Sequence, residues 1–320
     1  MGIIDKKMYE EARAFDRQIL ERIANGHLPD LRRAGRCEYF YNNVWRDQSF
    51  VELYFGEVVD KAIAALKKFI KKAESPRLLE VGCGPGHVCL ELARNGINVT
   101  GIDLSAECIR VAQSVAEDDP WKAERALLLY RQEDIFGVNE EFDAVLFVAS
   151  LHHFTDIDAV LKHVASLLVP DGLIIADEPC RDLVSRKNLA VIGLIKLLLS
   201  ESGSYYKNLE LPKDDKGLEQ FLDELFRQER YEEPDGTKVQ SINDNESSFA
   251  KMVPSLRSKF EELCFEKNYA MFHQLVGGIR LDNPAQERAM ARCLKILDVA
   301  LCRYGALDPV NFYYVGKKRE

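Results

Sequence analysis

The sequence contains no C-x-x-C pair, although eight of its 320 residues are cysteines. Such pairs are typical of zinc sites and redox motifs, and no other group of His, Cys or Asp has a spacing typical of metal ligands. We therefore predict no metal site. Cys83, Cys89 and Cys108 lie in apolar segments rather than in a disulfide framework, which predicts reduced thiols in a cytoplasmic protein.

The sequence also lacks an excess of positive charge and a long apolar run. A formal net charge of -9 at pH 7 is poorly suited to binding a phosphate backbone. The run "LAVIGLIKLLL" at 189–199 contains Lys196 and is shorter than the roughly 20 residues that cross a membrane. It fits a dimer surface and a buried helix equally well. We expect a small-molecule partner, neither nucleic acid nor membrane, and allow for a homodimer.

From Pro76 onward, apolar runs alternate with glycine turns and helical patterns, which is typical of βαβ units and a parallel sheet. The pattern of residues 1–75 predicts helices. A polar, charged stretch follows Pro179. Strands are expected at 77–82, 98–103, 126–134, 142–149, 172–178, 269–279 and 309–318.

Three glycines, Gly82, Gly84 and Gly86, follow the first expected strand and precede a helix. Glycine lets the backbone approach a ligand closely, because it has no Cβ. The dinucleotide fingerprint needs a further glycine at position 87, where this chain has His87. Glu80 would repel a pyrophosphate but attract an ammonium group. The loop therefore favours a cationic ligand without phosphate.

Two acidic segments follow the next strands. Asp103 ends the second strand, where a carboxylate can accept both hydrogen bonds of a ribose diol. Glu133 and Asp134 follow the third strand and can accept a bond from an exocyclic amino group, while Ile135 covers a flat adenine. Together the segments predict a ligand made of adenine, ribose and an amino-acid-like tail.

With these residues, the chain resembles the class I S-adenosylmethionine-dependent methyltransferases. The segments that carry the resemblance occur in order as "LLEVGCGPG", "GIDLS", "QEDI", "FDAVLFVASLHHF" and "LLVPDGLIIADEP", within about 76–180. The resemblance implies S-adenosylmethionine as cofactor and S-adenosylhomocysteine as product. It assigns to the cofactor Glu80, Gly82, Cys83, Gly84, Gly86, Asp103, Leu104, Glu133, Asp134, Ile135, Phe147 and Val148.

The implied fold is α/β, a doubly wound, mostly parallel seven-stranded sheet whose last strand is antiparallel. An N-terminal helical cap or lid is expected over 1–75 and the cofactor-binding core over 76–180. A helical insertion after the fifth strand, 181–250, would cover the acceptor side, and 251–320 would complete the sheet. The reaction implied is methyl transfer to a hydroxyl or amine of a small molecule.

His152 and His153 are the candidate catalytic bases, because they follow the fourth strand at the carboxyl edge, where open α/β sheets bind ligands. Consecutive side chains diverge, so one is expected to face the methyl group, and we favour His152 slightly. Packing against the following helix is the alternative for both. Asp177 and Glu178 are weaker candidates, since solvated charges at a strand end explain them equally well.

Residues 32–50 combine arginines with aromatic side chains, which fits a lid that closes over the cofactor as well as the ordinary packing of an N-terminal helix, the better explanation for most of these residues. Arg36 or Arg46 would pair with the methionyl carboxylate. The covering aromatics would come from Tyr39, Phe40, Tyr41 and Trp45.

Two other functions stay open on the sequence alone. A nicotinamide-dependent dehydrogenase would use a similar glycine loop, although His87 and Glu80 count against it. A protein that binds S-adenosylmethionine without consuming it would keep the same loops. The segment "VASLHHF" lacks the Asn/Asp-Pro-Pro-aromatic motif of methyltransferases that act on DNA bases.

Overall fold

The computed structural model describes residues 6–71 and 75–319. Its centre is a seven-stranded sheet in the order β3-β2-β1-β4-β5-β7-β6. β7 runs antiparallel to both of its neighbours, and the other pairs are parallel. The strands are β1 (Arg77–Val81), β2 (Asn98–Asp103), β3 (Leu128–Gln132), β4 (Phe142–Val148), β5 (Leu168–Pro179), β6 (Phe260–Asn268) and β7 (Asn311–Lys318). The expected doubly wound sheet is confirmed.

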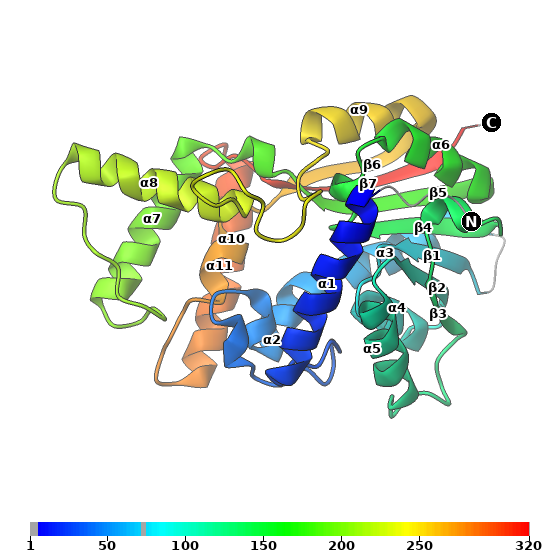
Figure 1. Cartoon of the computed structure of the whole chain (residues 1–320), viewed down its shortest axis with the longest axis horizontal. Coiled ribbons are helices and arrows are strands. Elements are labelled where there is room, and N and C mark those ends of the chain that lie inside the picture. Colours follow the sequence, from blue (N-terminus) through cyan, green and yellow to red (C-terminus); the bar gives the residue numbers. More distant parts are fainter. Residues whose placement is uncertain (1–5, 72–74, 320) are drawn as a thin grey trace.

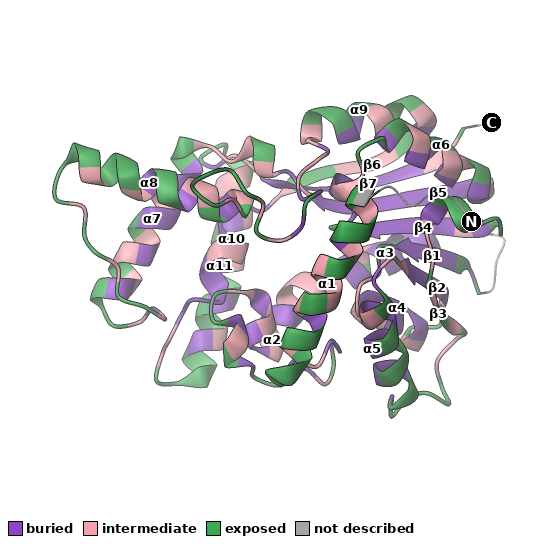
Figure 2. Ribbon diagram, viewed as in Figure 1, coloured by how far each residue is buried: buried purple, intermediate pink, exposed green. Residues whose placement is uncertain are grey.

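Helices cover both faces of this sheet (Figure 1). One face packs against α3 (Glu57–Phe69), α4 (His87–Arg94) and α5 (Ala106–Glu117), and the other against α6 (Ile157–Leu167) and α9 (Phe249–Lys259). Successive residues of a strand point to opposite faces, so Leu78 belongs to the first core and Leu79 to the second. Figure 2 shows the central strands buried along most of their length.

A third core lies beyond the carboxyl ends of the strands β5 and β6. Its elements are α2 (Gln48–Val51), α7 (Arg186–Glu201), α10 (Phe272–Val276) and α11 (Pro284–Arg303). One π-helical turn, Glu52–Gly56, joins α2 to α3. α7 packs on α8 (Asp215–Arg230) at the end of the molecule away from the sheet (Figure 1). Within "LAVIGLIKLLL", Leu189 and Ile192 are buried, whereas Leu194 and Leu198 are exposed.

The expected strand at 269–279 is wrong. That segment contains the short helix α10, and the strand next to β7 is β6, residues 260–268. The segment is apolar because it is buried in the third core, where amides of Ala270, Met271 and Phe272 donate to Asp298. The sequence did not predict β6, because this edge strand carries exposed glutamates and therefore shows no continuous apolar run.

The first helix, α1 (Lys6–Ala24), lies beside the sheet and contacts α5. Asp16 of α1 accepts hydrogen bonds from the Ser105 hydroxyl (2.6 Å) and the Glu107 amide (3.0 Å), at the N-terminus of α5. An acidic side chain there also interacts favourably with the helix dipole. These contacts join α1 to the core near the carboxyl ends of the strands. No described helix is long and apolar enough to cross a membrane.

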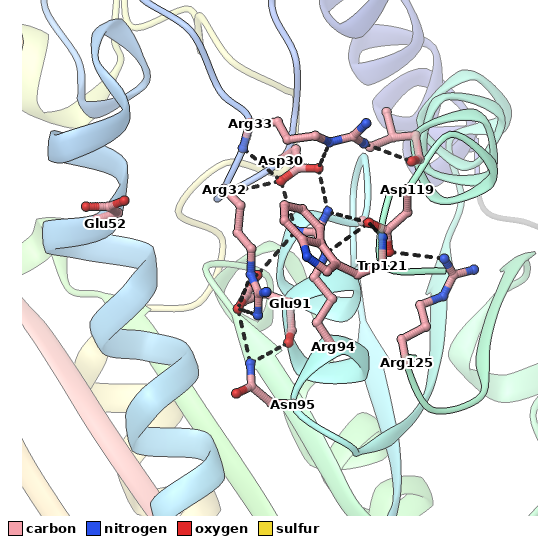
Figure 3. Close-up of polar contacts among 12 residues, drawn as sticks. Asp30, Arg32, Arg33, Glu52, Glu91, Arg94, Asn95, Asp119, Trp121 and Arg125 are labelled. Atoms are coloured by element: carbon pink, nitrogen blue, oxygen red, sulfur yellow. Dashed lines mark hydrogen bonds and ion pairs between the residues drawn. The ribbon is translucent and has the colours of Figure 1, made fainter. Parts of the chain in front are cut away.

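The segment after α1 is anchored by a buried ion-pair network around Arg94 (Figure 3). The Arg94 guanidinium donates to both oxygens of Asp30 (2.9 and 2.7 Å) and to Asp119 (2.9 Å). It also lies over the Trp121 ring, 4.8 Å from the centroid. All three charged side chains are almost fully buried. Although burial opposes it, hydrogen bonding to Arg94 and Arg33 lowers the pKa of Asp30 to about 2.

We expect Arg94→Met to lower the free energy of unfolding by about 3–5 kcal/mol, because it leaves two buried carboxylates without their main cation. The matched control is Arg110→Met, since Arg110 pairs with Glu107 on the surface, where an ion pair contributes about 0–1 kcal/mol. Urea unfolding of both variants measures the difference. Equal stabilities for the two variants would contradict the anchoring role of Arg94.

Candidate cofactor and acceptor site

A cavity of about 340 Å³ opens at the carboxyl ends of β1, β2 and β4. Its walls come from the glycine loop, the ends of β2 and β3, the turn after β4, α1 and the loop that contains Gln240 and Asn243. It falls within the usual size range of ligand pockets, about 300–1,000 Å³. This is the edge at which open α/β sheets bind their ligands.

Ten of the twelve residues assigned to the cofactor line this cavity: Glu80, Gly82, Cys83, Gly84, Asp103, Leu104, Glu133, Asp134, Ile135 and Val148. The other two, Gly86 and Phe147, do not. Phe147 is fully buried in the core on the α6 face. Gly86 packs against Tyr130, whose hydroxyl donates to the Gly86 carbonyl at 2.7 Å. We therefore correct these two assignments from ligand contact to support of the fold.

The three glycines of the loop differ in what lies beside them. All three glycines have positive φ, between +51° and +78°. A Cβ on Gly82 would lie 2.7 Å from Ser150 Cβ, so the loop can approach the turn after β4 only without a side chain. A Cβ on Gly84 would meet no atom within 4 Å. The space beside Gly84 is thus open to a ligand.

Asp103 is tied to the loop. Its two carboxylate oxygens accept from the amides of Gly84 and Ser105, both at 2.8 Å. Each oxygen has a second lone pair, which leaves room for a further hydrogen bond from a ligand hydroxyl. Burial raises the pKa of Asp103 despite these two bonds. Asp134 accepts from the Phe136 amide at 2.9 Å, beside the buried Ile135.

Glu80 is a buried carboxyl in the cavity wall. It accepts a hydrogen bond from the Cys89 thiol at 2.8 Å. Burial raises the pKa of Glu80 to about 7, and the nearby Asp103 adds to the increase. A cation that entered the cavity would stabilise the ionised form of both carboxyls. The buried carboxyls of the cavity wall therefore favour a cationic ligand.

His152 and His153 follow β4, but their rings do not diverge as expected, since the ring centroids lie only 4.2 Å apart. Ala149, with φ of +48°, turns the chain after the strand, and the Ser150 hydroxyl then donates to the Val81 carbonyl at 2.7 Å. His153 lines the cavity and His152 does not. The slight preference for His152 as the side chain facing the ligand is therefore wrong, because His152 points into a buried polar network.

Two buried carboxylates lie near the end of β5, and one of them, Glu178, contacts His152. Glu178 is fully buried, accepts from the amides of Ser150 (2.9 Å) and Leu151 (2.8 Å), and lies 2.7 Å from His152 Nδ1. Asp177 is also buried and accepts from Asn311 at 2.9 Å. Burial raises the pKa of Asp177 to about 7. Neither residue is a solvated charge at a strand end, and neither lines the cavity.

His153 contacts the N-terminal helix. Its Nδ1 lies 2.6 Å from Glu11 Oε1, and Ser241 Oγ lies 3.4 Å from the same nitrogen. Burial and the neighbouring His152 lower the pKa of His153, although Glu11 opposes this. Glu11 is held in turn by Ser241 and Asn243. The Glu11–His153 pair is therefore fixed from two sides of the cavity.

The helix α1, rather than residues 32–50, forms the wall opposite the glycine loop. Its lining residues follow the helical repeat: Lys7, Met8, Glu11, Ala12, Phe15, Ile19 and Arg22. Of residues 32–50, Trp45 alone reaches the cavity, where His87 packs edge-on against it. The repeat of apolar and charged residues in α1 was visible in the sequence. Nothing in it indicated which face meets a ligand.

The arginines proposed to bind a carboxylate are engaged elsewhere. Arg46 is fully buried and donates to Glu287 (2.6 Å) and the Ile279 carbonyl (2.9 Å). Arg36 pairs with Glu38 at 2.7 Å. Neither lines the cavity, so this assignment is wrong. Arg22 of α1 is the arginine that does line it.

Comparison with known proteins identifies the class to which this fold and site belong. The methyltransferase domain family matches residues 53–253, which is more than half of the chain. The chain therefore belongs to the class I S-adenosylmethionine-dependent methyltransferase family, whose cofactor is S-adenosylmethionine.

Two relatives illustrate the similarity. The "Ubiquinone biosynthesis O-methyltransferase" of Bradyrhizobium sp. (strain ORS 278) is 33% identical over 136 residues, 41% of this chain and 52% of the relative. The "Putative methyltransferase YqeM" of Bacillus subtilis (strain 168) is 35% identical over 112 residues, 32% of this chain and 42% of the relative. The chain thus spans about half the length of the curated relatives it matches.

Solved structures agree on the fold. The [4+2]-cyclase SpnF superposes with a TM-score of 0.50 at 16% identity, over 98% of this chain and 95% of the cyclase. A putative sarcosine dimethylglycine methyltransferase from Galdieria sulphuraria gives a TM-score of 0.50 at 12% identity, over 95% and 98% of the two chains. At these identities the comparison shows the fold alone.

We expect the affinity for S-adenosylmethionine to rise with pH toward 7, because the ionised form of Glu80 attracts the ligand's ammonium group. The raised pKa means that Glu80 is protonated below about 7, and a single linked proton changes affinity by up to about tenfold per pH unit. Calorimetry from pH 5 to 7 would measure the slope, since an α-amino group stays charged below about 7.7.

The control for this experiment is Glu80→Gln, which cannot ionise. In this variant the affinity for S-adenosylmethionine should change less with pH. The variant should still bind S-adenosylmethionine, but more weakly than the wild type does. A slope that is the same in both proteins would assign the linked proton to another group.

Proposed function

We propose that this chain binds S-adenosylmethionine in the 340 Å³ cavity and transfers its methyl group to a hydroxyl of a small-molecule acceptor. The observation that carries the proposal is the continuity of the cavity. It runs from the glycine loop, past Asp103 and Ile135, to His153 and the end of α1. One space therefore joins the residues assigned to the cofactor with the polar pair expected to meet the acceptor.

The residues present fit the cofactor. The space beside Gly84 admits a ligand, and Asp103 keeps free lone pairs for a ribose diol. Ile135 and Asp134 offer an apolar surface and an acceptor for the adenine. When bound, S-adenosylmethionine supplies an already activated methyl group. The chain's contribution is then mainly alignment, which can be worth about 7–11 kcal/mol.

Electrostatics support this cofactor over a dinucleotide. Burial raises the pKa of Glu80, Asp103 and the more distant Asp177, so the carboxyl edge of the sheet disfavours additional negative charge. A pyrophosphate would increase the repulsion, whereas a sulfonium and an ammonium group would relieve it. The dehydrogenase alternative is correspondingly weakened.

The Glu11–His153 pair is the proposed contact for the acceptor. It lines the cavity, and a hydroxyl placed against it can transfer its proton to the pair as the oxygen attacks. The names of matched relatives, ubiquinone biosynthesis O-methyltransferases, support a hydroxyl rather than an amine. His152 does not touch the acceptor in this arrangement.

Two segments are proposed to close the cavity. α1 would act as the lid, since one of its faces lines the cavity along several turns. Within the expected acceptor-side cover, 181–250, the residues that line the cavity are Gln240 and Asn243. We therefore assign the cover to the loop between α8 and α9 and leave α7 and α8 outside the site.

The main alternative is a protein that binds the cofactor but does not transfer its methyl group. The structural similarity to a [4+2]-cyclase means that this fold by itself does not decide the reaction. Binding and turnover must therefore be measured separately.

Titration calorimetry with S-adenosylmethionine, S-adenosylhomocysteine and NAD in parallel tests the cofactor. We expect both adenosyl ligands to bind and NAD not to bind. Asp103→Ala should weaken binding at least about tenfold, since a hydrogen bond to a charged group contributes about 1.5–3 kcal/mol. Binding of NAD alone, or unchanged affinity in Asp103→Ala, would overturn the assignment.

His153→Ala should lower turnover about 100-fold or more while leaving the affinity for S-adenosylmethionine unchanged, because it disrupts the Glu11–His153 pair that receives the acceptor's proton. Mass spectrometry of S-adenosylhomocysteine formed with a panel of small phenols and alcohols, and with matched amines, measures turnover. His163→Ala on α6 is the control, since His163 bonds to the Val138 carbonyl outside the cavity. Equal turnover in the two variants would mean that His153 packs within the fold and takes no part in the reaction.

A further inference from the structure

Three side chains at the acceptor end of the cavity lie close enough to share a metal ion. His152, His153 and Asp244 each offer one ligand atom, and these atoms lie within 4.8 Å of one another. We call these three residues the histidine cluster. His153 lines the cavity, while His152 and Asp244 lie just behind it and are 2% and 1% exposed.

Two atoms of the cluster are buried without a hydrogen-bond partner among the described residues. They are His152 Nε2 and Asp244 Oδ2. Leaving such a group unsatisfied costs about 1–3 kcal/mol, and more where it is charged. Asn243 Oδ1, from the cavity wall, is a third buried atom without a partner. A cation bound between these atoms would accept an electron pair from each of them.

The distances suit a metal better than a direct hydrogen bond. His152 Nε2 lies 3.6 Å from Asp244 Oδ1, which is too long for a hydrogen bond. Two ligand atoms bound about 2.1 Å from a tetrahedral ion lie about 3.4 Å apart. Oδ1 of this pair also contacts Arg181, but across the whole cluster one ligand atom from each side chain lies within 4.8 Å of the others, close enough for one shared ion.

The orientation of His152 is fixed by its other nitrogen. Nδ1 lies 2.7 Å from Glu178 Oε2, so the Nδ1–H donates to the carboxylate and Nε2 carries the free lone pair. Glu178 is itself held by the amides of Ser150 and Leu151. A carboxylate that orients a histidine in this way is the usual second layer of a metal site.

The local charge also favours a dication. Glu11, Glu178 and Asp244 surround the two histidines, and Arg181 pairs with Asp244 Oδ1 at 2.9 Å. Three carboxylates and one guanidinium therefore surround the two imidazoles in a largely buried space. Buried charges that are not balanced are costly. Because Arg181 occupies Oδ1, Oδ2 remains the oxygen available to an ion.

The loop that carries Asp244 is firmly attached. The Ser247 amide donates to the His152 carbonyl at 2.9 Å, and its hydroxyl donates to the Phe154 carbonyl at 2.6 Å. Arg181 also reaches Asn245 Oδ1 at 3.3 Å. The loop and the histidines are therefore held in register without a ligand, as a preformed site requires.

We infer that His152 Nε2, Asp244 Oδ2 and a ring nitrogen of His153 bind one divalent transition-metal ion. Two imidazoles and one carboxylate suit Zn²⁺ or Fe²⁺ rather than Mg²⁺ or Ca²⁺. This replaces the expectation of no metal site, which relied on spacing in the sequence. The ligands come from 152–153 and 244, segments that only the fold brings together.

The role of the ion rests on the proposed function, whereas its binding does not. An ion at this position would bind the acceptor's oxygen and lower the pKa of its hydroxyl. The hydroxyl proton would then pass to Glu11, the carboxylate beside His153. The Glu11–His153 pair keeps its place in the reaction, with His153 holding the ion.

Metal binding can be measured without cofactor or acceptor. The full chain is stripped with a chelator and titrated with Zn²⁺ by calorimetry and with Co²⁺ by absorption spectroscopy. We expect one ion per chain, and at least tenfold weaker binding in His152→Gln and in Asp244→Asn. Glu178→Gln should weaken binding about 10- to 100-fold, because it removes the group that orients His152.

His163→Gln is the matched control and should bind both ions like the wild type, since His163 lies outside the cluster. Calorimetry with S-adenosylmethionine on every variant checks that the chain is folded. If wild type binds neither ion, or if the cluster variants bind as His163→Gln does, the inference fails. Loss of metal binding with intact cofactor binding supports the inference, and cofactor failure with intact metal binding refutes only the proposed function.

Discussion

The arrangement of the site depends on the ion pair between Arg94 and Asp30. Arg94 ends α4, the helix that follows the glycine loop, and Asp30 follows α1, so their bidentate contact ties the segment after α1 to α4 (Figure 3). Asp119 and Trp121 complete the burial of the guanidinium. Together with Asp16 at the start of α5, this contact sets the distance between α1 and the sheet. With α1 in this position, Glu11 lies 2.6 Å from His153.

The carboxyl edge of the sheet concentrates negative charge that the protein only partly neutralises. Glu80, Asp103, Asp177 and Glu178 end strands or lie near their ends, and all but Asp103 are 3% exposed or less. Asp103 and Glu178 accept hydrogen bonds from backbone amides, Glu80 accepts one from Cys89, and Asp177 accepts one from Asn311. A sulfonium cofactor and a divalent ion would meet the same electrostatic requirement at the two ends of one cavity.

The adjacent histidines show how one turn can serve two purposes. Ala149 is forced into a left-handed conformation, and the turn that follows directs His152 toward Glu178 and His153 toward Glu11. Both carboxylates come from elements distant in sequence. The sequence motif placed the histidines at the correct edge, but their separate roles follow from β5 and α1, which meet them there.

The sequence by itself determined the parallel core, because its strands are apolar runs separated by glycine turns and helices with a regular repeat. It also located one wall of the cavity, since Gly82, Gly84, Asp103 and Ile135 lie at the ends of those strands. Only the tertiary structure decided three further points. The edge strand β6 carries exposed glutamates and has no periodic signal, while the apolar segment 269–279 is a helix buried in another core. The wall opposite the loop is α1, and the partner of the histidines is Asp244. Contacts across more than 60 residues decide both, and local sequence patterns do not encode such contacts.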